Sequence, residues 1–267
     1  MGNVPLLSIK NLKVIFQLDD QQIIAADGVD LDIKEGEVLV LAGQSGSGKT
    51  VTALSITQLL PPTAKIVSGT ILFKGRELLG SNEDDLRRLR GGEIAYIFQE
   101  PTAYLNPVFS IASQISEVIM LHQNKSRKQA IKEAEELLRN VKIKEPKERL
   151  SAYPHNLSGG MNQRVMIAMA LACRPTILIA DEPTTSLDVT TEAQILKLLL
   201  ELKKSLKFTL FFITHSLSVA HRIADRIAVM YKGKIVDEGL KDVIFSQPQH
   251  FHTKELIAAY EKIGKIQ

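Results

Sequence analysis

Cysteine and tryptophan are almost missing from this chain of 267 residues, which contains one Cys, Cys173, and no Trp. A single cysteine excludes an intramolecular disulfide framework and any four-cysteine metal or iron–sulfur site. Cys173 lies within the apolar run VMIAMALAC, which favours a packed small hydrophobic side chain over a reactive thiol. This cysteine usage suits a reducing cytosol.

Long apolar runs and strong charge bias are also missing. No apolar segment approaches the roughly 20 residues of a membrane-spanning helix. The start, MGNVPLLSIK, lacks the basic residues and long apolar stretch of a signal peptide. The net charge is only +3, and scattered Lys and Arg give no concentrated stripe for nucleic acid. We expect a cytosolic protein that reaches a membrane only through partners.

Apolar periodicity predicts the secondary structure. Alternating residues predict antiparallel strands over 7–16 and 29–33, and a buried strand over 37–43 precedes a helix over 50–60 that ends at Pro61-Pro62. Further strands are expected at 69–75, 93–99, 176–181, 207–214, 226–230 and 233–237. Helical periods occupy 81–90, 111–122, 126–141, a buried stretch from 165, 190–205 and 217–224.

Strands that alternate with helices predict an α/β fold with a mainly parallel sheet covered on both faces. The amount of chain fits one domain. Residues 5–99 and 166–240 are expected to form its core, which includes an antiparallel β part. A helical lobe over 100–165 interrupts the core, and a helical tail covers 241–267.

Residues 43–50, GQSGSGKT, match the phosphate-loop pattern G-x-x-x-x-G-K-[ST], with a buried strand before it and a helix after it. The glycines allow backbone N–H groups to close around phosphate oxygens, and the helix start adds the positive end of its dipole. Lys49 is expected to reach the β- and γ-phosphates, and the Thr50 hydroxyl to bind Mg²⁺.

Polar residues follow three other expected strands. The strand ILIADEP delivers Asp181 and Glu182 to its C-terminal end, where α/β proteins place ligands. One carboxylate can hold Mg²⁺ while the other polarises an attacking water. Gln99 follows the strand IAYIF and His215 follows FFIT, so both are candidates for the same site.

A second glycine turn, LSGGMNQR at 157–164, opens another helix more than a hundred residues after the first. Ser158, Gly159 and Gly160 have the composition of a phosphate-holding turn. Its distance along the chain from Lys49 predicts that it does not serve the same nucleotide.

These pieces together resemble the ATP-binding cassette (ABC) ATPase family. Their order and spacing are similar to the family's over essentially the whole chain: GQSGSGKT, Gln99, LSGGM, ILIADEP, Ser186-Leu187-Asp188 and His215. The resemblance implies a P-loop ATPase core with an inserted helical subdomain that carries the LSGG sequence. ATP and Mg²⁺ are the implied cofactors.

The resemblance also implies roles for individual residues. Glu182 looks like the general base, His215 like the switch histidine and Gln99 like the Q-loop glutamine that senses Mg²⁺ and the membrane subunit. Thr50, Gln99 and Asp181 are the implied metal contacts. Phe16 falls where the family stacks an aromatic ring on adenine, although a core strand role fits it as well. The implied nucleotide contacts are Phe16, Gly43, Gln44, Ser45, Gly46, Ser47, Gly48, Lys49, Thr50, Val51, Ser158, Gly159, Gly160 and Asp188.

Two residues depart from the family pattern. Met161 replaces the commoner glutamine of the LSGG sequence, and Ser216 replaces the aspartate that usually follows the switch histidine. Both changes leave the expected catalytic groups in place, so they bear on the rate of hydrolysis rather than on its presence.

Within the family, FQEPTAYLNPVFSI, YPHNLSGGMNQRVMIAMAL and ADEPTTSLDVTTEAQIL resemble importers of dipeptides, oligopeptides and nickel. The segment His250-Phe251-His252-Thr253 resembles that group's "HPYT" segment, and we interpret it as a helix start rather than a metal site. Peptide is the expected cargo, with nickel or a metal chelate as the alternative. Implied partners are a second cassette, preferably a different chain, two membrane permeases and, indirectly, an external solute-binding protein.

A soluble ABC protein acting on nucleic acid or ribosomes is the rival hypothesis. Tandem cassettes, long coiled-coil insertions and zinc modules typical of those proteins do not occur in this sequence. A non-catalytic partner cassette is a third possibility, against which Glu182 and His215 argue, because degenerate cassettes typically lose one or both. We therefore expect an ATPase at the cytoplasmic face of a membrane, held there by permeases and without a nucleic-acid partner.

Overall fold

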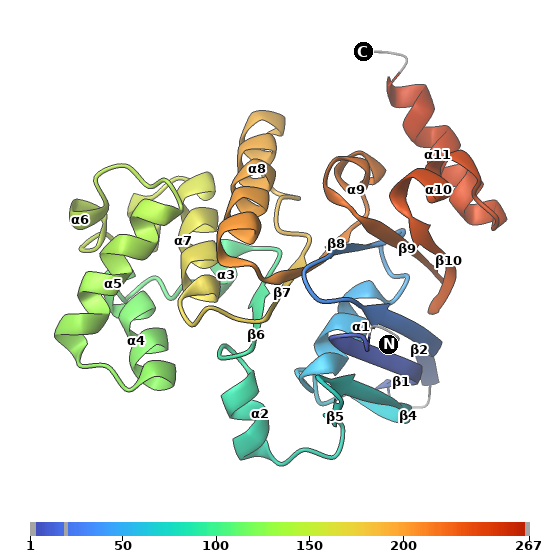
Figure 1. Cartoon of the computed structure of the whole chain (residues 1–267), viewed down its shortest axis with the longest axis horizontal. Helices are drawn as coiled ribbons and strands as arrows, with labels where there is room; N and C mark the ends of the chain where they lie inside the picture. The colour runs from blue at the N-terminus through green and yellow to red at the C-terminus, as the bar shows by residue number, and fades with distance from the viewer. Residues whose placement is uncertain (1–3, 19–20, 265–267) are drawn as a thin grey trace. The chain divides into compact units, whose positions relative to one another are not determined.

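The structure is a computed structural model that describes residues 4–18 and 21–264. The chain divides into two compact units, which are described separately below. The first unit comprises Met1–Leu86 with Thr209–Gln267, and the second comprises Arg87–Phe208 (Figure 1). Helix α2 (Glu83–Leu89) spans the chain position at which the first unit gives way to the second.

An antiparallel sheet forms one part of the first unit. Its strands run in the order β2-β1-β4-β5, with bounds Leu7–Leu18 (β1), Gln21–Ile33 (β2), Ala64–Phe73 (β4) and Arg76–Glu77 (β5). The antiparallel arrangement confirms the expectation from residue alternation, and Leu7 pairs with Ile33. Strands β2 and β4 begin earlier than predicted, because pairing with β1 extends them through residues that are mostly exposed and do not alternate between apolar and polar.

Parallel strands form the other part of the first unit. Strand β3 (Val38–Ala42) lies between β8 (Thr209–Thr214) and β9 (Arg226–Tyr231), parallel to both. Strand β10 (Lys234–Leu240) pairs with β9 antiparallel at the edge. Every residue of β3 and β8 is buried, which is the pattern of strands covered on both faces. The predicted α/β class is thus confirmed.

Among the described residues of the first unit, these strands are accompanied by α1 (Lys49–Ile56), α9 (Leu217–Ile223), α10 (Lys241–Ser246) and α11 (Phe251–Gly264). Helix α1 is shorter than the predicted helix over 50–60, which was wrong at its C-terminal end. Gln58 has φ of 55°, and its side-chain amide donates to the Leu78 carbonyl oxygen at 2.8 Å. The helix therefore stops well before Pro61, because this left-handed residue already turns the chain.

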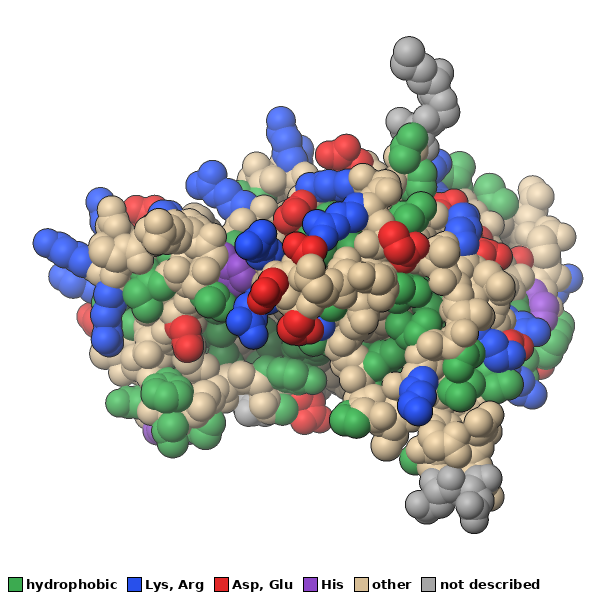
Figure 2. Space-filling view, turned by 90° about the horizontal axis from the view of Figure 1, so that it is seen from below, with side chains coloured by type: hydrophobic (Ala, Val, Ile, Leu, Met, Phe, Trp, Pro, Cys, Tyr) green, Lys and Arg blue, Asp and Glu red, His purple; other side chains and the backbone are tan. Residues whose placement is uncertain are grey.

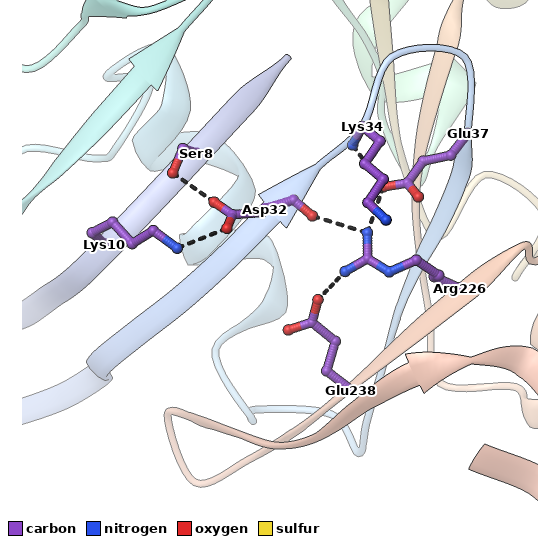
Figure 3. A network of polar contacts seen from close by, with 7 residues as sticks. All are labelled: Ser8, Lys10, Asp32, Lys34, Glu37, Arg226 and Glu238. Carbon is purple, nitrogen blue, oxygen red and sulfur yellow. Dashed lines mark hydrogen bonds and ion pairs between the residues drawn. The ribbon is translucent and has the colours of Figure 1, made fainter. Parts of the chain in front are cut away.

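A network of charged side chains joins the two parts of the first unit (Figure 3). The Arg226 guanidinium donates to Glu37 Oε1 at 2.7 Å and to the Asp32 carbonyl oxygen at 3.2 Å, and it also pairs with Glu238. On its far side, the Asp32 carboxylate accepts from Lys10 at 2.8 Å. The network thus links β1 and β2 of the antiparallel sheet to β9, β10 and the turn before β3.

The second unit contains two parallel strands and a group of helices, drawn in green to orange in Figure 1. Strand β6 (Ile94–Ile97) pairs with β7 (Ile177–Asp181). The helices are α3 (Pro101–Tyr104), α4 (Ile111–Gln123), α5 (Arg127–Asn140), α6 (Pro146–Arg149), a 3₁₀ turn (Pro154–Asn156), α7 (Gly159–Leu171) and α8 (Val189–Leu206).

Helix α7 starts at Gly159, within the second glycine turn, as expected for a turn that opens a helix, whereas the apolar period alone placed a buried helix only from 165. It runs without a break through position 165, where we expected the helical lobe to end. The subdomain limits 5–99, 100–165, 166–240 and 241–267 remain predictions.

Cys173 follows α7 and is partly buried. Burial raises the pKa of its thiol, and its Sγ lies 3.8 Å from both the Val118 carbonyl oxygen and Gln123 Nε2. A thiol with a raised pKa stays protonated at neutral pH and is a poor nucleophile. These properties are those of a packed side chain.

The surface shown in Figure 2 has basic side chains interspersed with acidic ones. Within residues 4–18 and 21–264, no helix has the length and apolar character needed to span a bilayer.

Candidate functional site

The phosphate-loop sequence forms a tight turn between β3 and α1 in the first unit. Gly48 has φ of 105°, in the left-handed region that favours glycine, and a Cβ at this position would lie 2.1 Å from the Ala25 carbonyl oxygen. A Cβ on Gly43 would lie 2.3 Å from the Met230 carbonyl oxygen. The loop therefore fits between β2 and β9 only because both positions lack side chains.

Buried polar side chains line this turn. Lys49, 4% exposed, donates from Nζ to the carbonyl oxygens of Gly43 and Gln44, both at 2.9 Å. The Ser47 hydroxyl is buried and has no hydrogen-bond partner among the described residues. A buried hydroxyl without a partner costs free energy, so a ligand in this turn that accepts a hydrogen bond from Ser47 would remove that cost.

The electrostatics of the turn favour an anion. Helix α1 starts at Lys49, its first turn contains no acidic residue, and no described side chain caps it. The positive end of the helix and its first N–H groups are therefore left to a ligand. Together with the ammonium of Lys49 and the hydroxyl of Ser47, these donors fit a polyphosphate.

The remaining residues of the predicted loop are accessible. Gln44, Ser45 and Gly46 are exposed at its outer side, and Thr50 is exposed in the first turn of α1. Val51 follows within the helix and is half-buried. The Thr50 hydroxyl is thus available to a metal ion at the helix start.

His215 lies at the same edge of the first unit as the phosphate loop. Ala42 pairs with Thr214 in the parallel ladder of β3 and β8, so Gly43 and His215 leave neighbouring strands at the same level. His215 is exposed. The following residue, Ser216, accepts a hydrogen bond from the Val219 N–H at 3.3 Å and caps α9. The departure from aspartate at 216 therefore keeps a helix-capping residue.

Phe16 is a half-buried strand residue rather than part of a closed core. It pairs with Ile23 of β2 and Ala64 of β4. Ile23 is 51% exposed, and two residues further along β2 the Ala25 carbonyl meets Gly48. The Phe16 ring therefore belongs to an exposed apolar area close to the phosphate loop.

The second unit brings the predicted acidic residues and Gln99 to one edge. Ile97 of β6 pairs with Ala180 of β7, so Gln99 and Glu182 both lie two residues beyond a paired position. Asp181 is 8% exposed at the end of β7, and Gln99 is exposed. Glu182 has φ of 46°, an uncommon conformation for a non-glycine residue that often marks a functional position.

Threonines that we did not select from the sequence shape the turn after β7. The Thr185 hydroxyl donates to Glu182 Oε2 at 3.0 Å, and the Thr184 hydroxyl donates to Glu192 Oε2 at 3.2 Å. The two threonines follow the acidic pair in TTSLD, but their partners depend on how the turn folds. The bond from Thr185 fixes the direction of the Glu182 carboxylate.

The second glycine turn packs against the turn that precedes α8, also in the second unit. Ser158 caps α7 by accepting from the Met161 N–H at 3.3 Å. A Cβ on Gly160 would lie 2.8 Å from Thr191 Cγ2, so this position needs a small residue. Asp188 caps α8, and hydrogen bonds from Thr191 lower the pKa of the Asp188 carboxyl. The predicted residues Ser158, Gly159, Gly160 and Asp188 thus belong to two adjacent helix starts.

A buried strand that runs into a glycine loop and a helix, among parallel strands flanked by helices, defines a P-loop α/β fold. Comparison with known families narrows this class. Residues 26–185 match the model of the family described as "ABC transporter". The chain belongs to the ABC transporter family, as the motifs in the sequence indicated.

Two curated relatives are similar over nearly the whole chain. "Peptidoglycan transport ATP-binding protein YejF" of Agrobacterium fabrum is 52% identical over 97% of this chain and 47% of its own length. "Glutathione import ATP-binding protein GsiA" of Escherichia coli is 48% identical over 99% of this chain and 43% of its own length. The chain therefore spans about half the length of the curated relatives it matches.

A solved structure agrees with the fold. The dimeric ATP-binding cassette MJ0796, in a post-hydrolysis state bound to ADP and Pi, superposes with a TM-score of 0.78 and 30% identity. The match covers 88% of this chain and 98% of that chain. The α/β fold with its antiparallel part is thus the fold of ABC cassettes.

Proposed function

We propose that this chain binds ATP with Mg²⁺ and hydrolyses it as the energy-supplying subunit of a peptide importer. The phosphate loop carries the proposal, because Lys49 and the Ser47 hydroxyl are buried beneath a helix start, and among the described residues no side chain caps that start or bonds that hydroxyl. A buried cluster of donors that faces no acidic residue of α1 is suited to the phosphates of a nucleotide.

Each predicted residue has a place in the proposed reaction. Thr50 and Asp181 are the residues that would hold Mg²⁺, which when bound neutralises charge on the phosphate oxygens. Glu182 would take a proton from the attacking water as the bond between the γ-phosphorus and the bridging oxygen breaks, giving ADP and phosphate. Gln99 and His215 would contact the water, the metal and the γ-phosphate, and Phe16 would stack on the adenine.

The second glycine turn suggests that two cassettes work together. Ser158 and the N–H groups of Gly159 and Gly160 open α7 and offer donors to an anion. In the proposed dimer they face the γ-phosphate on a partner's phosphate loop, with Asp188 close by. The dimeric state of MJ0796 supports such a pair. We favour a different cassette as the partner.

Cargo and location follow from the relatives and remain part of the proposal. One relative is named for glutathione, a tripeptide, and the other for peptidoglycan, which contains peptide. These names favour peptide cargo over the nickel or metal-chelate alternative. Two permease subunits would hold the chain at the cytoplasmic face of the membrane, and an external solute-binding protein would deliver the cargo to them.

Replacing the proposed base tests the catalytic assignment. Glu182→Gln removes the proton acceptor but keeps the hydrogen bond from Thr185, so turnover should fall by about 10²–10⁴-fold with ATP binding retained. Phosphate release would be measured in the assembled transporter. Glu201→Gln, on the exposed face of α8 in the same unit, is the control and should keep wild-type turnover. Wild-type turnover in Glu182→Gln would refute the base.

A second substitution tests the shared site. Ser158→Arg places a long side chain at the start of α7, so it should block hydrolysis at the partner's phosphate loop while nucleotide binding to its own loop stays intact. Binding of Mg·ADP to the isolated chain and phosphate release by the assembled pair would be compared. Equal phosphate release by the variant and wild-type pairs would show that this turn serves no partner.

A further inference from the structure

The segment His250-Phe251-His252-Thr253 at the start of α11 is fastened to the hairpin of β9 and β10 in the first unit. His252 is only 2% exposed, and its ring stacks on Tyr231, the last residue of β9, with ring centroids 4.1 Å apart. Phe251 meets the same tyrosine edge-on, with centroids 5.8 Å apart. Two consecutive rings of the tail therefore hold one side chain of the hairpin.

The other strand of the hairpin is held as well. The N–H of His250 donates to Asp237 Oδ2 of β10 at 2.9 Å, and the Asp237 carboxylate is 8% exposed. A hydrogen bond from a backbone N–H to a buried carboxylate is charge-assisted and stronger than a neutral one. Because both β9 and β10 are contacted, the tail restrains the position of the hairpin rather than of one strand.

The same hairpin touches the phosphate loop on either side of Tyr231. The carbonyl oxygen of Met230 occupies the space beside Gly43, and Met230 Sδ lies 3.9 Å from the hydroxyl of Thr52 in α1. The N–H of Gly233 donates to the Ser47 carbonyl oxygen at 2.9 Å. Met230, directly before Tyr231, and Gly233, two residues after it, thus contact the beginning and the middle of the loop.

We propose that His252 and Tyr231 are positioning residues for the phosphate loop, through which the C-terminal helix sets the loop's affinity for nucleotide. The inference rests on the proposed function of the loop. Stacking of His252 on Tyr231 fixes the β9–β10 turn, and the turn fixes the backbone of Ser47 and Gly43. A loop that must offer several donors to phosphate at once loses affinity when its backbone shifts.

A second aromatic cluster provides a matched control. His221 of α9 packs edge-on against Phe245 of α10, with centroids 4.8 Å apart, and its ring lies 6.1 Å from that of Tyr260 in α11. His221 therefore helps to anchor the same C-terminal helices, but through α9 and α10 instead of through the β9–β10 turn. Loss of either histidine ring weakens tail packing, whereas only loss of His252 removes the stack on Tyr231.

The test measures the affinity of the full chain for Mg·ADP in three variants by equilibrium dialysis, alongside their thermal unfolding. His252→Ala should weaken binding by about 3- to 10-fold, the range expected for loss of an aromatic pair. His252→Phe keeps a ring against Tyr231 and should stay within about twofold of wild type. His221→Ala should also stay within about twofold at a comparable loss of thermal stability.

The outcomes distinguish failure of the proposed nucleotide binding from failure of the positioning role of His252. Wild-type chain that does not bind Mg·ADP at millimolar concentration overturns the proposed function, and the inference with it. Wild-type binding that His252→Ala leaves unchanged, or that His221→Ala weakens equally, overturns only the positioning role. If His252→Ala does not fold, His252→Leu, which fills the volume without a ring, takes its place with the same expectation.

Discussion

Removal of the guanidinium of Arg226 should destabilise the first unit far more than removal of a surface charge in the same network. Arg226 and Glu37 are only 14% and 9% exposed at their side chains, and their ion pair is 2.7 Å long. Substitution by Met keeps much of the side-chain volume but leaves the Glu37 carboxylate without its cation. A buried charge that loses its partner costs several kcal/mol because water no longer solvates it.

The magnitude follows from what remains around Glu37. Loss of one member of a buried pair typically costs about 3–5 kcal/mol. Glu37 keeps a hydrogen bond at 2.7 Å from the Lys34 N–H, which places Arg226→Met near the lower end, at about 3 kcal/mol. The pair of Lys10 with Asp32 is 50% and 40% exposed, so Lys10→Met should cost at most about 1 kcal/mol.

Urea unfolding followed by circular dichroism would measure these free energies. The double variant Arg226→Met with Glu37→Gln removes the unpaired carboxylate charge. It should recover part of the lost unfolding free energy, because the amide oxygen of Gln still accepts a hydrogen bond from the Lys34 N–H. A cost below about 1 kcal/mol for Arg226→Met would refute the reasoning. So would a double variant as unstable as the single one, since the stranded carboxylate would then not be the cause.

Two further predictions concern the phosphate loop and the tail. Gly48→Ala brings a Cβ to 2.1 Å from the Ala25 carbonyl oxygen at φ of 105° and should cost at least about 3 kcal/mol of unfolding free energy. Gly46→Ala, with φ of 76° and open space, should cost only about 1–2 kcal/mol, and equal losses in urea unfolding would contradict the steric argument. Burial lowers the pKa of His252 below its ordinary 6.5, and Glu255 opposes only part of this shift. The unfolded chain therefore binds the proton first, so stability should fall as pH drops below about 6.5, by at most about 1.4 kcal/mol per pH unit. His252→Phe should make that slope shallower, and an unchanged slope would exclude the group.

Local patterns in the sequence predicted most elements correctly, and they also supplied the candidate site residues, which remain a proposal. GQSGSGKT lies between an apolar run typical of a buried strand and a segment with helical periodicity. The hydrophobic periodicity and the spacing of the glycines therefore predicted β3, the loop and the start of α1. The end of α1 did not follow, because Gln58 turns the chain by a side-chain bond to Leu78, twenty positions away. The extension of β2 and β4 likewise depended on pairing with β1.

The sequence by itself determined the family, the fold class and which residues come at strand ends and helix starts, because each of these depends on neighbours a few positions away. Only the tertiary structure decided which distant backbone atoms surround the loop. The carbonyl oxygens of Ala25 and Met230 explain why Gly48 and Gly43 must be glycine, and Thr191 explains the same for Gly160. Strand register and helix packing bring such atoms together, and neither leaves a periodic trace in the chain.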